Sequence, residues 1–420
     1  MKRILFALFA LFFVSLAGIS KKFDDSQLSD RALRTMDTCM ALVHDGQYEA
    51  ALERFDRLVK EYPESYVVQY ERMCALYRLR RYDETVKAAK ALIKQKNATE
   101  AVYQVYGNAL DDAGQTAEAI KIYNEGVKLF SDAGNLYLEL GVINMREKKY
   151  GDAIAEFEKG IVADPDFASN YYRAAQILFG SDNSNVKVWA LVYGESAALL
   201  APTNQNRMKE MARNIRELWK KSIEFSDDGV RISLVEGKQV NINIDGENAE
   251  LSFANVYEGC AGLAVLQNME LMNPFTASLE QLIVLRKGLV ESYFKVTDNL
   301  FGNSMYLLPY LKSLIDAGHW EAYNYFLFGS VFPEDFDKWI EDNEDKLYAF
   351  AAWYNEHPYV LDATHTVCDL QIDRDRRKIS LMEALMIAGS FNPDKDSSDD
   401  SSDDSSDDPG HPSAEPPSQD

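Results

Sequence analysis

Positive charge is scarce in this chain. Its 44 lysines and arginines stand against 67 aspartates and glutamates, which gives a formal net charge of -23. Nucleic acid phosphates and anionic bilayer surfaces carry the same sign of charge, so this excess disfavours direct binding to either. We therefore expect no nucleic acid partner.

Metal ligands and phosphate-binding loops are also scarce, with only 5 histidines and 4 cysteines and no glycine-rich nucleotide fingerprint. His357, Asp362, His365 and Cys368 lie close together in the sequence, but their spacing matches no tight zinc pattern. Pro358 also breaks any helical face that they could share. A loop with satisfied polar groups is the favoured interpretation, and we expect neither a metal nor a cofactor.

A serine motif of ester hydrolases is present only in part. Gly194-Glu195-Ser196 matches its beginning, but the motif needs a second glycine two residues after the serine, where this chain has Ala198. The motif also needs a sharp turn from strand to helix, whereas 189–200 reads as one continuous helix. We expect no catalysis by Ser196 and no enzyme activity.

A long apolar run occurs only at the start of the chain. Lys2 and Arg3 precede an apolar stretch from Ile4 to Leu16, and the small residues Ala17 and Gly18 follow it. This order is typical of a secretory signal peptide spanning 1–18. The run is shorter than the roughly 20 residues that a membrane span requires. We expect a periplasmic or secreted mature chain with no integral membrane segment, and the alternative is an uncleaved N-terminal anchor.

An internal repeat runs through the first half, with a period of about 34 residues. Tyr48 and Tyr82 lie one period apart, and Tyr150 follows two periods after Tyr82, with Thr116 in the place between. A fixed period of this length indicates a repeat architecture. Three further rows keep the same step: Ala51, Thr85, Ala119 and Ala153; Phe55, Ala89, Tyr123 and Phe157; and Pro63, Asn97, Ser131 and Pro165.

The third and fourth units resemble the tetratricopeptide repeat family. The fourth carries Tyr137, Leu140, Gly141, Ala153, Phe157 and Pro165, and the third carries Tyr103, Gly107, Ala119 and Tyr123. The first two units depart from the pattern, because Cys39 and Met73 replace the glycine. A fifth, degenerate unit spans Asp166 to Pro202 and is interrupted near 181–185. The resemblance implies stacked helix pairs whose first helices line a concave side.

These patterns predict a mainly α fold. We expect a solenoid of about five repeats with a capping helix over 27–225, a mostly helical α+β domain over 226–391, and a disordered acidic Ser/Asp/Pro tail over 392–420. Alternating residues predict a three-stranded antiparallel meander, with strands at 230–234, 240–244 and 251–253. Ser278 and Gln281 have the spacing of a helix capping box.

The resemblance further implies a binding groove along the first helices. Its predicted lining residues are Tyr70, Tyr77, Gln104, Asn108, Asp112, Asn135, Arg146, Tyr172 and Gln176. Tyrosines and amides suit an extended peptide or a helix. We expect an exported scaffold or adaptor that binds a protein or peptide there. Some of these residues could instead pack against the capping helix or the second domain.

Two alternatives for the function stay open. In the first, the C-terminal domain is an uncharacterised enzyme, and in the second, the chain is a self-assembling structural component of the cell envelope. The four cysteines of an exported chain could pair as Cys39 with Cys74 and Cys260 with Cys368, or they could all be buried free thiols.

Overall fold

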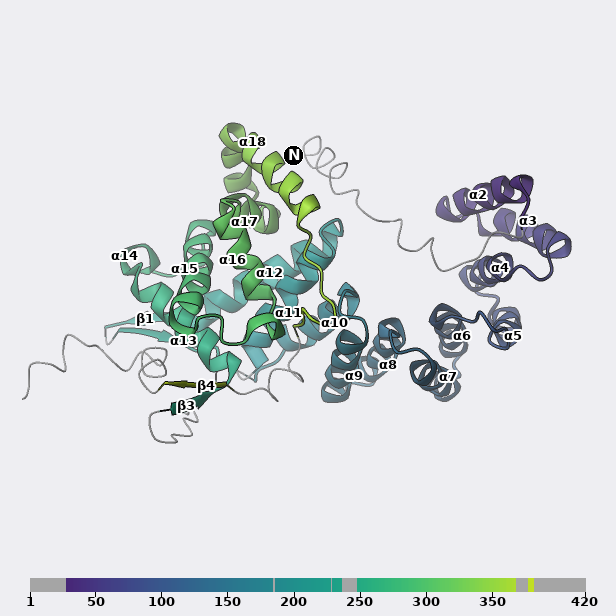
Figure 1. The fold of residues 1–420 in the computed structure, drawn as a ribbon, viewed down its shortest axis with the longest axis horizontal. Helices are drawn as coiled ribbons and strands as arrows, with labels where there is room; N and C mark the ends of the chain where they lie inside the picture. The colour runs from purple at the N-terminus through teal and green to yellow at the C-terminus, as the bar shows by residue number, and fades with distance from the viewer. Residues whose placement is uncertain (1–27, 184–185, 228, 236–247, 368–376, 381–420) are drawn as a thin grey trace, which may run out of the picture.

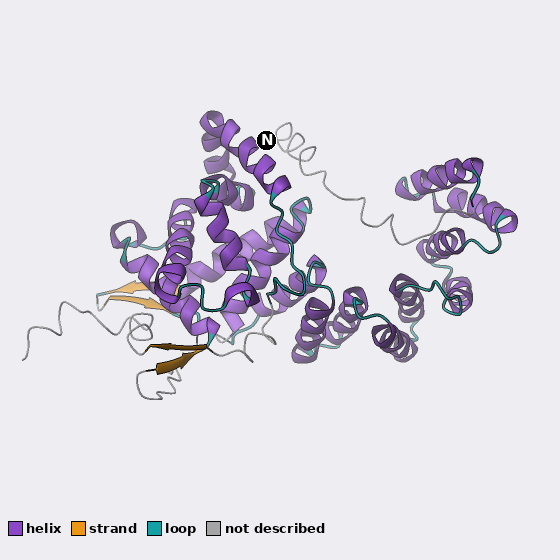
Figure 2. Ribbon diagram, in the orientation of Figure 1, coloured by secondary structure: helices purple, strands orange, loops and turns teal. Residues whose placement is uncertain are grey.

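The computed structural model of this 420-residue chain describes residues 28–183, 186–227, 229–235, 248–367 and 377–380. The predicted signal peptide and the predicted acidic tail lie outside these ranges. In Figure 1 the early helices form an arc on one side, and the C-terminal helices gather into a compact group on the other. Helices dominate both parts, as Figure 2 shows.

Five helix pairs make up the first half, which confirms the predicted solenoid. They are α2 (Asp30–His44) with α3 (Tyr48–Glu61), α4 (Tyr66–Arg78) with α5 (Tyr82–Leu92), α6 (Glu100–Asp112) with α7 (Thr116–Leu129), α8 (Gly134–Arg146) with α9 (Tyr150–Ala163), and α10 (Ala168–Phe179) with α11 (Lys187–Leu200). The second helices of the first four pairs begin one period apart. The fifth does not, because the period would start α11 at 184 and it starts at Lys187.

Glycine allows the third and fourth pairs to pack closely. A Cβ atom on Gly107 would lie 2.1 Å from the ring of Tyr123, and one on Gly141 would lie 2.3 Å from the ring of Phe157. Both rings are almost completely buried. Each aromatic ring of a second helix therefore occupies the space that the missing side chain of the first helix leaves open.

In the second pair the large side chain lies on the first helix and the small one on the second, the reverse of the third and fourth pairs. Met73 stands where Gly107 and Gly141 stand in later pairs, and Ala89 stands opposite in place of an aromatic ring. Both side chains are fully buried in one hydrophobic cluster. Since a large residue on the first helix goes with a small one on the second, the core volume is kept.

The C-terminal half is a helical group with two short sheets. Its elements are α12 (Gln205–Ser222), β1 (Ile223–Ser226), β2 (Gly229–Ile232), β3 (Asn248–Leu251), α13 (Phe253–Leu266), α14 (Met269–Met272), α15 (Leu279–Thr297), η3 (Gly302–Ser304), α16 (Leu307–Asp316), α17 (Trp320–Phe328), α18 (Pro333–Glu356) and β4 (Arg377–Ser380). The capping box of Ser278 and Gln281 is confirmed at the start of α15.

The outer strands of the predicted three-stranded meander have partners that the sequence pattern did not give. β2 pairs with β1, which the sequence pattern had assigned to the end of the capping helix. β3 pairs with β4, more than a hundred residues later in the chain. Phe253 begins α13 rather than ending a strand, because Ser252 caps that helix by accepting the backbone N–H of Asn255. The predicted middle strand at 240–244 lies outside the described residues.

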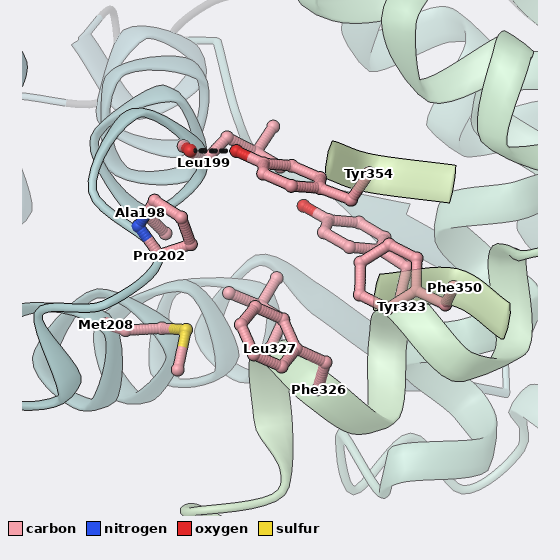
Figure 3. Close-up of a pocket in the computed structure, with 9 residues that line it drawn as sticks. All are labelled: Ala198, Leu199, Pro202, Met208, Tyr323, Phe326, Leu327, Phe350 and Tyr354. Carbon is pink, nitrogen blue, oxygen red and sulfur yellow. Dashed lines mark hydrogen bonds between the residues drawn. The ribbon is translucent and has the colours of Figure 1, made fainter. Parts of the chain in front are cut away.

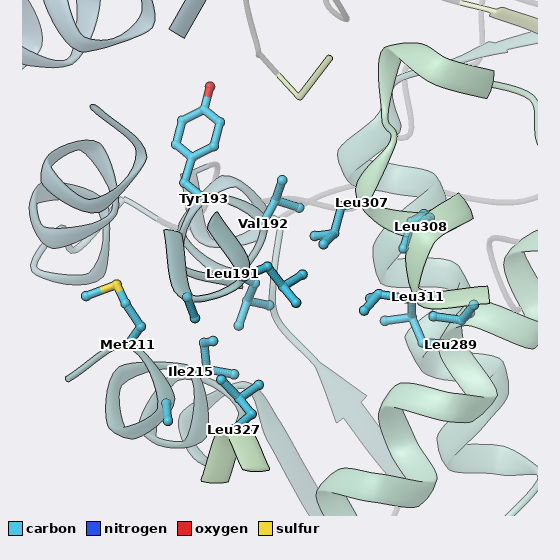
Figure 4. Close-up of a cluster of buried hydrophobic side chains, with 14 of the residues drawn as sticks. Leu191, Val192, Tyr193, Met211, Ile215, Leu289, Leu307, Leu308, Leu311 and Leu327 are labelled. Atoms are coloured by element: carbon cyan, nitrogen blue, oxygen red, sulfur yellow. The ribbon is translucent and has the colours of Figure 1, made fainter. Parts of the chain in front are cut away.

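One hydrophobic cluster joins the last repeats to the C-terminal helices. It runs from Ala153 in α9 to Val367 and includes most of the apolar residues of α11, in which every residue from Val188 to Leu199 is buried. A helix that is apolar all round must be buried on every side, and α11 is covered by α10, α12 and α13. Figure 4 shows side chains of α11 and α12 converging with leucines of α15, α16 and α17. The predicted capping helix α12 therefore has a second neighbour in α17.

Within the described ranges, no helix combines the length and the apolar composition of a bilayer span.

Candidate functional site

The first helices of consecutive pairs lie side by side along the solenoid. α6 contacts both α4 and α8, α8 contacts α10, and α10 contacts α12. All nine residues predicted to line a groove lie on α4, α6, α8 and α10. None of the nine is fully buried, since Asp112 and Arg146 are exposed and the others are half-buried. We call the surface that these residues share the first-helix face.

An amide cluster occupies the middle of the first-helix face. Gln104 Nε2 donates a hydrogen bond to Glu139 Oε1 at 2.8 Å, and Asn108 Nδ2 donates to the same oxygen at 3.4 Å. Asn135 Nδ2 donates to Gln104 Oε1 at 3.0 Å. Three predicted residues from two repeats are thus gathered around one carboxylate, that of Glu139, which the prediction had missed.

The charge of Glu139 is solvated mainly by these amides. Burial raises the pKa of its carboxyl, while the hydrogen bonds from Gln104 and Asn108 act in the opposite direction. Glu71 on α4 is also half-buried, and burial raises its pKa to about 6. The buried Oδ1 atom of Asn135 has no hydrogen-bond partner, so one acceptor of the cluster is left unused.

A second group links α4, α6 and α8. Tyr77 Oη donates to Asp112 Oδ2 at 2.8 Å. Arg146 donates to both carboxylate oxygens of Asp111, at 2.8 and 2.7 Å, and this pair lowers the pKa of Asp111. The bidentate geometry holds Arg146 against the preceding repeat. Asp111 was not predicted, although it lies one period after Tyr77 and so belongs to the same row.

A third group joins α10 to α12. Tyr172 Oη donates to Glu210 Oε2 at 2.7 Å, and Gln176 Nε2 donates to Glu210 Oε1 at 2.7 Å. The guanidinium of Arg207 lies 4.7 Å from the centre of the Tyr172 ring. Tyr172 and Gln176 therefore contact the capping helix, which is the alternative that the sequence had left open for some of these residues.

Tyr70 lies at the other end of the first-helix face. Its ring stacks on Tyr66 of the same helix, with centroids 6.5 Å apart and planes 8° apart. Burial raises the pKa of its hydroxyl far above the usual range. Tyr70 thus places a half-buried aromatic ring on the first-helix face at the second repeat.

The predicted bridge between Cys39 and Cys74 is not formed, since both are free. The residue one period after Cys39 is Met73, so Cys74 is turned by about 100° around its helix. Cys39 accordingly lies inside the cluster of the first repeat, whereas Cys74 packs against the cluster of the next one. Cys260 is also free and buried, and its predicted partner Cys368 lies outside the described residues.

The partial serine motif is enclosed in the core, on the continuous helix that the sequence predicts. Ser196 is fully buried, and its Oγ lies 3.1 Å from the hydroxyl of Tyr359. Glu195 forms a buried ion pair with Arg286 of α15, and Tyr323 Oη donates to the same carboxylate at 2.7 Å. These groups satisfy one another and connect α11 to the C-terminal helices.

The loop that contains Asp362 and His365 forms a hydrogen-bonded turn. Asp362 Oδ1 accepts the backbone N–H groups of Thr364 and His365, and these bonds help to lower the pKa of Asp362. The ring of His365 lies against Tyr306. Across the described residues, no group of three or more potential metal ligands is found.

A small apolar cavity lies between α11, α12, α17 and α18. Its walls are drawn in Figure 3, and its volume is about 10 Å³. The side chain of Tyr354 forms part of the cavity wall, and its hydroxyl donates a hydrogen bond to the backbone oxygen of Leu199 at 2.5 Å. A volume of this size is at or below the space that one water molecule needs, so the cavity offers no room for an organic ligand.

Comparison with known proteins identifies the repeats. The family model for the N-terminal TPR repeats region of Psidin matches residues 31–154. A search of the curated proteins finds no match.

Several solved structures share the arrangement at low similarity. A thermophilic TPR protein from Thermus thermophilus is 17% identical with a TM-score of 0.37, over 44% of this chain and 98% of that one. YrrB, a TPR protein with an unusual peptide-binding site, is 16% identical with a TM-score of 0.29, over 41% and 88%. The TPR2AB domain of yeast Sti1, from a complex with pHSP90, is 17% identical with a TM-score of 0.24, over 44% and 82%.

Proposed function

Because the N-terminal part of this chain is a tetratricopeptide repeat solenoid, we propose that the protein is a scaffold that holds another protein through its first-helix face. The partner would present an extended segment or a helix to that face. Repeats of this kind stack without a closed active site, and their long continuous surfaces suit protein binding.

The amide cluster is the observation that carries the proposal. Gln104, Asn108 and Asn135 each have both a donor and an acceptor, which is the combination that a peptide backbone requires. Hydrogen bonds from Gln104 and Asn108 to Glu139, and from Asn135 to Gln104, hold them in place before any partner arrives. A surface that is ordered in advance loses less conformational entropy on binding.

Site-specific photocrosslinking in the intact cell tests this proposal. A photoreactive amino acid replaces Arg78, an exposed residue at the end of α4 that is one period before Asp112. The matched control replaces Glu118, an exposed residue of α7 on the second helix of a pair. We expect a discrete partner adduct from position 78 and none from position 118. Adducts from 118 alone, or equally from both, would reject the first-helix face as the binding surface.

We also propose that the chain is exported to the periplasm or secreted. The support is the sequence alone, in which two basic residues, an apolar run and small residues follow one another over 1–18. N-terminal sequencing of the protein from its native cell should find a start near Gly18 or Ile19. Recovery of Met1 on soluble cytosolic protein would contradict the export.

A further inference from the structure

Apolar side chains are exposed on the first helix of the first pair. Leu33 and Met40 of α2 keep 36% and 42% of their surface accessible. Asn108 lies two periods after Met40, and Asn135 lies three periods after Leu33. Both residues therefore occupy positions of the first-helix face that are filled by amides in the third and fourth pairs. The face is apolar at its N-terminal end and polar in its middle.

Carboxylates without an ion-pair partner mark the part of the face beyond this apolar end, and the charge of Arg173 acts on Glu139 only from beyond contact distance. Glu71, Asp112 and Glu139 have no lysine or arginine within ion-pair distance among the described residues. The nearby Arg146 is already held by both oxygens of Asp111. Glu71 and Glu139 are two periods apart, so they occupy the same position on α4 and α8.

Burial of two of these carboxylates costs desolvation free energy, and a charged partner could offset that cost. Glu71 and Glu139 are half-buried, and burial raises the pKa of each. Desolvation disfavours a charge unless a group of opposite charge compensates it. A lysine or arginine of a bound segment would supply that compensation, whereas an acidic segment would be repelled.

We infer that the first-helix face takes an extended partner segment that carries an apolar side chain for α2 and a lysine or arginine for α6 and α8. This inference rests on the proposed function and gives the chemistry of its partner. The carboxylates of Asp112 and Glu139 receive the cationic side chain, and Leu33 and Met40 contact the apolar one. The amides between them bind the partner's backbone.

The spacing of the helices sets the spacing of the two anchors. Packed helix axes lie about 8–10 Å apart, and at the upper end of this range two to three steps along the face span about 20–30 Å. An extended chain advances about 3.3 Å per residue. The apolar and the basic side chain should therefore be separated by about six to nine residues.

Selection from a random 16-residue peptide library displayed on phage tests the inference. The immobilised full chain is compared with two double variants, Asp112→Asn with Glu139→Gln and Leu33→Ser with Met40→Ser. The matched control is Glu118→Gln with Glu125→Gln, which removes two exposed charges from the second helix α7. Circular dichroism confirms that each variant keeps its helix content before selection.

The wild-type chain should enrich lysine or arginine roughly threefold, at about six to nine residues from an apolar residue. The first double variant should lose the basic enrichment, the second should lose the apolar one, and the control should keep both. Enrichment of acidic or uncharged peptides, or a basic enrichment that survives Asp112→Asn with Glu139→Gln, would overturn the inference and leave the scaffold function standing. No enrichment of any peptide over a bare support would count against the scaffold function itself.

Discussion

The carboxylate of Glu195 on α11 is paired with the guanidinium of Arg286 on α15, and both side chains are almost completely buried. Arg286 also donates to Asn324, and its guanidinium lies 5.2 Å from the ring centres of Trp320 and Phe328. An ion pair inside this hydrophobic cluster ties the fifth repeat to the C-terminal helices. The repeats and the C-terminal half should therefore hold a defined position relative to each other.

Removing one partner of this pair should be strongly destabilising. In Arg286→Met, the carboxylate of Glu195 stays buried without its cation, and such a change costs about 3–5 kcal/mol. Urea unfolding followed by circular dichroism measures the loss. The matched control is Lys312→Met, which breaks the exposed pair of Lys312 with Asp316 and should cost about 0.3–0.5 kcal/mol. Equal losses in the two variants would show that the buried pair has no special role.

Close packing at Gly141 should make even a methyl group costly there. The Cβ atom of Gly141→Ala would lie 2.3 Å from the Phe157 ring, so the two helices of the fourth repeat must separate. Overpacking of this kind costs about 1–3 kcal/mol. Gly151→Ala is the control, because nothing lies within 4 Å of its added Cβ, and helix propensity should leave it neutral or up to about 1 kcal/mol more stable. Thermal melting compares the two, and similar melting temperatures would contradict the packing argument.

The carboxyl of Glu71 should make stability depend on pH. Its folded-state pKa of about 6 is above the ordinary value of 4.5, so the native state binds this proton more tightly than the unfolded state. This contribution to stability is present below pH 4.5 and is lost as the pH rises through about 6.

Glu71→Gln should therefore be more stable than the wild type at pH 7, and the difference should vanish below pH 4.5. Melting temperatures of both proteins across this range measure it. Glu118→Gln, which changes an exposed carboxyl, is the control. A variant that melts below the wild type at pH 7 would show that Glu71 stabilises the unbound fold.

Three thiols should be unreactive in the native protein. Burial raises the pKa of Cys39, and it raises the pKa of Cys74 and of Cys260 to about 12. The thiolate is the reactive form, so a thiol reagent at neutral pH should label these residues only after denaturation. Labelling without reductant, followed by mass spectrometry, identifies each site. An unlabelled Cys39 and Cys74 in denatured protein would indicate a bridge between them.

Local sequence signals determined most of the repeat half. The repeat period located the helix pairs, because each turn and each packing position recurs in every repeat and neighbours only the next one. The same logic placed all nine predicted residues on first helices. It missed Glu139 and Asp111, whose importance comes from hydrogen bonds to other repeats rather than from their own helices.

Contacts across long sequence separations were decided only by the tertiary structure. β3 pairs with β4 from the far end of the chain, and no local alternation of residues can specify such a partner. The sequence predicted α12 as a capping helix, but its contact with α17 depends on where α11 places the C-terminal core. The sequence by itself determined which segments of the repeat half are helices and which of their residues share a helix face, since these follow from spacings of a few residues. Which buried charges meet, as Glu195 meets Arg286, required the whole fold, because ion pairing depends on distance in space and not on distance along the chain.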